Sequence, residues 1–262
     1  MKEIFFSITL FCYFLATLIH FLFLGLRRNL LLFIAMVTVV VGFICHTTAL
    51  IFISFETGHG PYTNFFEYMA FFPWTIVLIY LIVEFRYRIK DLGSFVIPLA
   101  FLMLAYSKLL PEEVSPSTNV LRFWATLHYT LSFLGYAAFA LTFGAGLMYM
   151  IQERQLKSKK PGSFYYRLPS LELLDNLNHR LISIGFPLFT LGFVTGSIWI
   201  GKIKGDYLSW DPVKTLPLII TWMIYAALFI GRITVGWRRR RAALGAIIGF
   251  FLIIITYWMH VN

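Results

Sequence analysis

Eight long apolar runs constrain what this 262-residue chain can fold into more than any other feature. Most of them hold the roughly 17–25 residues that a helix needs to cross the hydrocarbon of a bilayer. The polar stretches between them are too short to fold as separate domains. We therefore predict an all-α polytopic membrane bundle of about eight transmembrane helices, forming a single integral-membrane domain over residues 1–262. The expected helices are 4–26, 30–53, 66–83, 92–106, 123–151, 181–200, 216–235 and 242–259.

Charge supports a membrane location and argues against nucleic acid. Only 13% of the residues are charged, against about 25% in soluble domains. The net charge of +10 would suggest nucleic-acid binding in a soluble protein. In a membrane protein the same excess reflects Lys and Arg gathered in cytoplasmic loops. We expect a lipid bilayer as partner and no nucleic acid.

The distribution of these basic residues predicts the topology. Alternate loops carry most of them: Arg27, Arg28, Arg86, Arg88, Lys90, Arg154, Lys157, Lys159, Lys160, Arg167, Arg180, Arg232 and Arg238 to Arg241. The other loops and the N-terminus hold few: Lys2, Lys108, Arg122, Lys202, Lys204 and Lys214. Because the richer side of a membrane protein is cytoplasmic, both termini are expected outside. The first run is too long for a signal peptide and lacks a cleavage site, so we expect a retained helix.

One external stretch, 201–215, has an unusual composition. It reads GKIKGDYLSWDPVKT and places Tyr207, Trp210, Asp211 and Pro212 within six residues, among three lysines. Proline disfavours helix at the residue before it and suits the first helical turn. Asp211 is therefore expected to cap the helix that enters the seventh run.

Histidines supply the candidate metal ligands. His128 lies at the outer end of the fifth run beside Tyr129, and His260 is expected on the same face. A lone interfacial histidine is more often a hydrogen-bonded surface residue than a ligand. His46 lies inside the second run, where an ionisable group is costly and usually faces a cavity, partner or ligand. His59, between two glycines, is expected at the surface unless a partner fixes it.

Converging histidines and aromatic side chains suit haem. Neutral imidazole is a good axial ligand for iron, and aromatic rings such as Trp199 gather on the same face. Lysines such as Lys204 could pair with haem propionates. The residues alone leave quinone, lipid and peptide ligands open. No CxxCH motif is present for covalent attachment of a c-type haem. Cys12 and Cys45 lie in apolar runs and are expected to be packed thiols.

The segment TGSIWIGKIKGDYLSWDPVKTLPLIITWMIYAALFIGR resembles the tryptophan-rich "WWD" segment of the cytochrome c assembly family. That family includes the CcsA/ResC and CcmC haem-handling proteins and the shorter HemX-type proteins. GHGPYTNFFEYMAFFPW is similar to its N-terminal external segment, with Asn64 and Glu67 at matching places. LHYTLSFLGYAAFALTFGAGLMYMIQERQLK is similar to the helix of the first external histidine, here His128. The likeness covers most of residues 55–245, in order.

The resemblance implies a protein of the bacterial inner membrane that binds a b-type haem transiently at its outer face. In the CcsA branch a CcsB/ResB-like membrane protein joins it, and haem passes to apocytochrome c. It implies His128 and His260 as iron ligands, and a WWD-like segment at 199–222 that contacts the macrocycle. The haem-binding residues expected on these grounds are His128, Trp210, Asp211, Tyr207, His260, His46, Trp199 and Lys204. No residue is assigned to catalysis, and a role as a subunit of a cytochrome c haem lyase stays open.

Departures from the family pattern leave two alternatives open. CcsA-type proteins often carry a histidine near the end of the seventh helix, where this chain has Ile230. Lys204 and Leu208 stand where the family has further tryptophans. The chain stops at Asn262, before the tail that holds the second external histidine, and His260 is the nearest substitute. These features favour a HemX-like protein that influences the level of glutamyl-tRNA reductase through contact, or a structural subunit without ligand.

Overall fold

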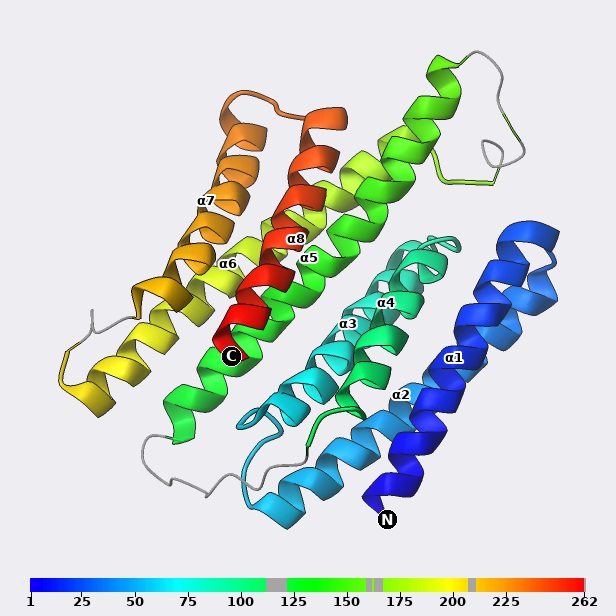
Figure 1. Cartoon of the computed structure of the whole chain (residues 1–262). Helices are drawn as coiled ribbons and strands as arrows, with labels where there is room; N and C mark the ends of the chain where they lie inside the picture. Colours follow the sequence, from blue (N-terminus) through cyan, green and yellow to red (C-terminus); the bar gives the residue numbers. More distant parts are fainter. Residues whose placement is uncertain (112–121, 159–161, 163–166, 207–210, 262) are drawn as a thin grey trace. The chain divides into compact units, whose positions relative to one another are not determined.

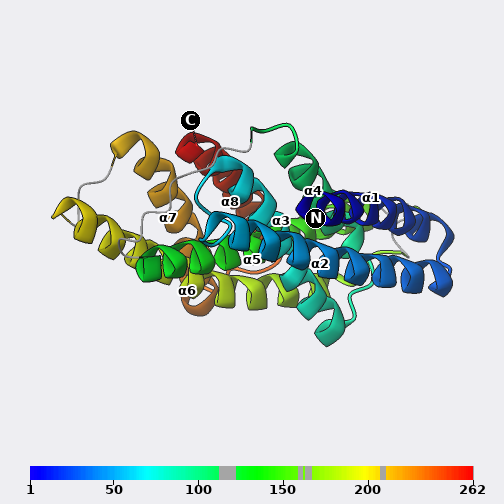
Figure 2. The ribbon, with the colours of Figure 1, turned by 90° about the horizontal axis from the view of Figure 1, so that it is seen from below.

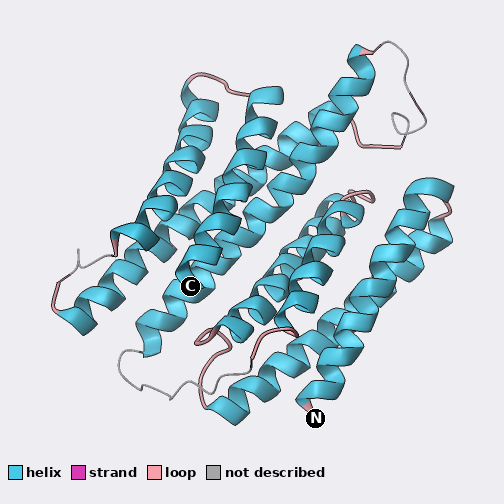
Figure 3. Ribbon diagram, viewed as in Figure 1, coloured by secondary structure: helices cyan, strands magenta, loops and turns pink. Residues whose placement is uncertain are grey.

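Helices account for all the regular structure of the described residues, as the apolar runs predict. The computed structural model describes residues 1–111, 122–158, 162, 167–206 and 211–261; the side chains of 122, 212–214 and 256–261 lie outside that description. Six helices of the described part are long and apolar enough to cross a membrane. The elements are α1 (Lys2–Leu26), α2 (Asn29–Thr57), α3 (Phe65–Tyr87), α4 (Gly93–Ser107), α5 (Arg122–Lys157), α6 (Leu171–Lys204), α7 (Pro212–Thr234) and α8 (Arg240–Val261) (Figures 1 and 3).

The chain divides into two compact units, residues 1–118 and 119–262. In unit 1, α1 packs along α2 and α4, and α3 packs along α4. In unit 2, the long helices α5 and α6 lie side by side, and α8 packs against α5 and α7 (Figures 1 and 2). The single domain expected over residues 1–262 stays a prediction.

Helix α6 differs most from the sequence prediction. It begins at Leu171, ahead of the expected 181, and the Ser170 side chain accepts a hydrogen bond from the Leu173 N–H at 3.3 Å. It continues to Lys204 and ends where Gly205 adopts a left-handed conformation with φ 75°. The first residues of the 201–215 stretch are therefore the last turn of a helix, where a loop was expected. Hydropathy missed the start because the first turns of α6 are polar.

Each unit gathers basic residues at one end, as the loop charges predict. In unit 1, Arg27 Nη1 lies 2.6 Å from Asp91 Oδ1 and joins the α1–α2 turn to the loop before α4. Burial raises the pKa of the Asp91 carboxyl above its usual value, and Arg27 acts against that shift. In unit 2, Arg232 Nη1 lies 2.8 Å from Asp175 Oδ1, joining α7 to α6.

Asn64 and Glu67 close the N-terminus of α3. Asn64 Oδ1 accepts a hydrogen bond from the Glu67 N–H at 2.8 Å, and Glu67 Oε2 accepts one from the Thr63 N–H at 2.8 Å. This reciprocal arrangement satisfies backbone donors that a helix start leaves unpaired. The two residues that matched the family segment thus have a structural role in starting α3.

Replacing Asn64 with alanine is expected to lower the free energy of unfolding by about 1 kcal/mol, the usual cost of losing an N-cap side chain. Unfolding by titration with sodium dodecyl sulfate measures it. Asn176→Ala, at an exposed position inside α6, is the matched control. Equal stability of the two variants would contradict the capping role.

Candidate functional site

Small residues bring α5 and α6 close together in unit 2. A Cβ atom added at Gly192 would lie 2.4 Å from Ser132 Oγ, and one added at Gly185 would lie 2.9 Å from Ala138 Cβ. At Gly196 it would lie 2.6 Å from His128 Nδ1. Gly192 and Gly196 are four residues apart, the spacing that lets membrane helices approach at backbone distance. This contact holds His128, near the start of α5, directly against α6.

The His128 imidazole is oriented by the backbone of α6. Its Nδ1–H donates to the Gly192 carbonyl oxygen at 2.7 Å. A carbonyl can only accept, so Nδ1 carries the proton and Nε2 carries the lone pair in the neutral ring. Histidines that bind metals are typically held in this way, with the second ring nitrogen donating to a carbonyl or carboxylate. The geometry therefore fits a metal-ligating histidine.

Aromatic rings flank this imidazole. The Trp199 ring lies nearly parallel to it, with centroids 6.2 Å apart and an interplanar angle of 27°. The Tyr129 ring is 5.0 Å from His128 and meets Trp199 edge-on at 5.7 Å. Trp199 Nε1 is buried and has no hydrogen-bond partner among the described residues. We call His128, Tyr129 and Trp199 the His128 cluster.

The His128 cluster lies at the end of unit 2 away from the Asp175–Arg232 pair, because it joins the start of α5 to the end of α6. Lys202 at this end places its Nζ 5.5 Å from the centre of the Trp124 ring. Lys204 is exposed as the last residue of α6. An aromatic surface with lysines beside it suits a flat, anionic ligand.

Replacing Gly196 with alanine is expected to displace the imidazole. The new methyl group would overlap the His128 ring at 2.6 Å, so the ring or the helix must move. Overpacking of this kind costs about 1–3 kcal/mol, and a lower thermal unfolding temperature in detergent measures it. Gly25→Ala is the control, since nothing lies within 4 Å of a Cβ there. An unchanged unfolding temperature for Gly196→Ala would contradict the close packing.

The other predicted residues of this face are only partly described. Asp211 directly precedes α7, and its carbonyl accepts a hydrogen bond from the Thr215 N–H at 2.9 Å, which is the position of a cap residue; capping by its side chain stays a prediction. Tyr207 and Trp210 lie outside the described residues, and so does the side chain of His260. Their place beside His128 stays a prediction. Among the described residues no group of three or more His, Cys, Asp or Glu could hold a metal ion.

Comparison with known proteins places this architecture in a family. A family model described as "Cytochrome C assembly protein" matches residues 62–261. The chain belongs to this family.

Three relatives named "Cytochrome c biogenesis protein CcsA" show the level of similarity. The relative from Mesostigma viride is 31% identical over 228 residues, covering 78% of this chain and 74% of the relative. The one from Porphyra purpurea is 31% identical over 243 residues, covering 78% and 76%. The one from Prochlorococcus marinus (strain MIT 9515) is 34% identical over 232 residues, covering 79% and 74%.

The family match includes the whole His128 cluster and begins after α2. His46, on α2, therefore precedes the matched region. It is fully buried in unit 1, and its Nδ1 lies 3.3 Å from the Tyr13 hydroxyl. Its Nε2 has no hydrogen-bond partner in the part of the chain that the structure describes. The position is that of a core histidine, and a haem-binding role for it stays a prediction.

His59 was expected at the surface unless a partner fixed it, and in the structure neighbouring groups do fix it. Its side chain is buried, with Nδ1 2.9 Å from the Gly60 carbonyl and 3.8 Å from Glu67 Oε2. The cause is Gly58, whose left-handed conformation (φ 72°) ends α2 and turns the following residues back onto the start of α3. The glycines were expected to leave His59 mobile, but Gly58 instead forms a tight turn that holds it.

Ile230 is the residue that the family resemblance sets opposite a histidine of CcsA-type proteins. This residue of α7 is 54% exposed. An exposed isoleucine on a membrane helix suits contact with lipid and offers no ligand to a metal.

Proposed function

We propose that this chain acts in cytochrome c biogenesis as a membrane protein that binds haem at the His128 cluster. The observation that carries the proposal is the hydrogen bond from His128 Nδ1 to the Gly192 carbonyl, with the Trp199 ring alongside. The family membership and the CcsA relatives support the biological process. The orientation of His128 supports the chemistry.

The residues present fit a haem group. His128 Nε2 would ligate the iron, since the bond through Nδ1 fixes the tautomer and raises the basicity of the ring. Trp199 would pack its face on the macrocycle, and its buried Nε1–H, unpaired among the described residues, would donate to an acidic substituent. Lys204 would pair with a propionate. When bound, haem supplies the porphyrin that becomes linked through thioethers to apocytochrome c.

The finer parts of the proposal rest on the family resemblance. His260 would be the second iron ligand, and Tyr207, Trp210 and Asp211 would complete the haem-facing segment. A CcsB/ResB-like membrane protein would be the partner and apocytochrome c the acceptor. The basic ends of both units would face the cytoplasm of a bacterium, because basic loops stay on that side. The His128 cluster would then lie at the outer face. A role in controlling glutamyl-tRNA reductase is less well supported, since the relatives described above are named for cytochrome c biogenesis.

A visible spectrum tests the proposal directly. The full chain, purified in detergent from cells supplied with a haem precursor, is expected to show a Soret band. Treatment with alkaline pyridine should give the spectrum of a b-type haem. A colourless preparation that retains no haem after incubation with haemin and gel filtration would overturn the proposal.

A further inference from the structure

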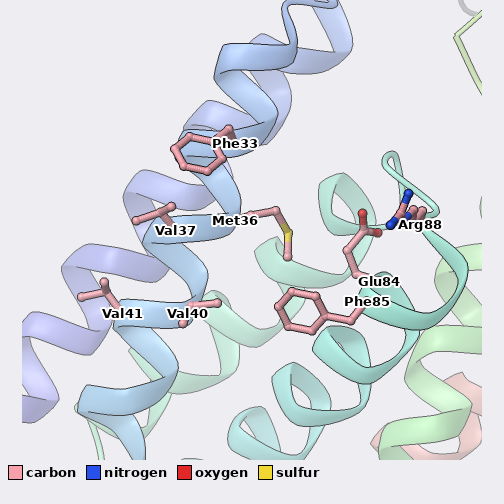
Figure 4. Close-up of a pocket in the computed structure, with 8 residues that line it drawn as sticks. All are labelled: Phe33, Met36, Val37, Val40, Val41, Glu84, Phe85 and Arg88. Carbon is pink, nitrogen blue, oxygen red and sulfur yellow. The ribbon is translucent and has the colours of Figure 1, made fainter.

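A pocket opens between α2 and α3 in unit 1. Its volume is about 460 Å³, within the range of ligand sites. Phe33, Met36, Val37, Val40 and Val41 line it from α2, and Glu84, Phe85 and Arg88 line it from α3 and the residue that follows (Figure 4). The walls are apolar except for Glu84 and Arg88, which lie next to each other at one end. An apolar pocket with two charges at one end suits an amphipathic ligand.

Glu84 is the unusual member of this pocket. Its side chain is only 7% exposed, and Oε2 is buried without a hydrogen-bond partner among the described residues. A buried acid in a membrane helix is costly unless a partner offsets the charge. The neighbouring acid Asp91 is already paired, at 2.6 Å from Arg27. Tyr80, one turn earlier on α3, directs its hydroxyl to Met36 Sδ at 3.3 Å. Glu84 therefore faces the pocket near Arg88 and Lys90, but among the described residues its carboxylate forms no ion pair within 4 Å.

Two basic residues lie at the rim of the pocket, just beyond the end of α3. Arg88 ends the helix in a left-handed conformation (φ 53°) and is exposed, as is Lys90. This is the basic end of unit 1, where a membrane helix meets the lipid head groups. The pocket thus offers, in order, an apolar cleft, a buried carboxyl group and an exposed guanidinium at head-group depth.

We propose that this pocket binds one phospholipid whose head group carries a primary ammonium, of the ethanolamine class. One acyl chain fills the cleft between α2 and α3. The phosphate pairs with Arg88 at the rim, and the ethanolamine arm folds back so that its ammonium donates to the Glu84 carboxylate. Residues four apart on a helix lie about 6 Å from each other, a spacing that suits the two neighbouring charges of this head group. Choline has no N–H to donate, and a glycerol head group has no cation.

Lipid binding to the delipidated full chain, measured by native mass spectrometry, tests this inference. The probes are phosphatidylethanolamine, phosphatidylcholine and phosphatidylglycerol with the same palmitoyl and oleoyl chains. The wild-type protein is expected to bind the ethanolamine lipid about tenfold more tightly than the other two. Glu84→Gln should reduce its affinity to that for phosphatidylcholine. Val40→Trp, which fills the cleft, should weaken the binding of all three lipids.

Glu172→Gln, at an exposed acid of α6, is the matched control and should leave the lipid preference unchanged. Equal binding of the ethanolamine and choline lipids by the wild type would overturn the proposal, and so would an ethanolamine preference that survives in Glu84→Gln. Tightest binding of the glycerol lipid would show that the basic rim alone attracts anionic lipid. If the variants fail to fold, the ranking of the three lipids on the wild type decides.

Discussion

Replacing His128 with glycine is expected to remove the Soret band from the purified protein, and added imidazole is expected to restore it. The glycine variant loses the only described imidazole of the cluster but leaves a space of the size of the lost ring. Imidazole can enter that space and supply the same nitrogen ligand to iron. Absorbance near the Soret maximum, divided by protein concentration, is the measurement. A loss of more than tenfold is expected without imidazole.

The control for this variant is His179→Gly, which removes a half-buried histidine from the polar start of α6. It should keep its haem, since the start of α6 lies far along the helix from Trp199. The imidazole rescue separates a lost ligand from a damaged fold, because a misfolded protein would not recover. A His128→Gly protein that keeps its full Soret band would show that other residues hold the haem. In that case Trp199 and His128 would be an ordinary packed pair.

The positions of the helices were largely predictable, because crossing a bilayer demands long apolar runs. The exception was the start of α6. Asp175 and Asn178 lie in that polar segment, yet both are buried in unit 2. Hydropathy assigns such residues to a loop, because it takes no account of the ion pair between Asp175 and Arg232 of α7. The missing information was a contact between residues far apart in the chain.

The candidate site was predictable in its residues but only partly in its geometry. His128 and Trp199 were both identified, from their place at the chain's less basic face and from the family resemblance. The orientation of His128 was not, since it depends on the Gly192 carbonyl, 64 residues away. The spacing of Gly192 and Gly196 was the signal available in the sequence. It marks a close helix contact and could have indicated which face of α6 meets α5.

The burial of Glu84 was not predictable from the sequence, for a similar reason. It stands just beyond the third apolar run, among Arg86, Arg88 and Lys90, and looks like one charge of a solvated loop. In the structure α3 continues to Tyr87, which puts Glu84 in the last turn of the helix and against the α2–α3 pocket. Four further helical residues, 84–87, thus place an acid that was expected in a loop in a buried position.

Replacing Asp175 with alanine is expected to lower the free energy of unfolding by about 3–5 kcal/mol, the cost of removing one partner from a buried ion pair. Asp175 Oδ1 accepts from Arg232 Nη1 at 2.8 Å and from the Arg239 N–H at 2.7 Å. The side chains of Asp175 and Arg232 are only 11% and 9% exposed. Without the carboxylate, a nearly buried guanidinium and a backbone donor lose their acceptor. Unfolding by titration with sodium dodecyl sulfate measures the loss.

A double-mutant cycle separates this cost from general damage to α6. Asp175→Ala combined with Arg232→Ala should be less destabilised than the sum of the two single variants, because it leaves no uncompensated charge. Glu172→Ala, exposed in the first turn of the same helix, should stay within about 0.5 kcal/mol of wild type. Additive effects of the two single changes would contradict direct pairing. If the coupling is found, Asp175 joins α6, α7 and the start of α8 at the basic end. The ion pair then stabilises one end of α6, while the opposite end of the helix contributes Trp199 to the His128 cluster.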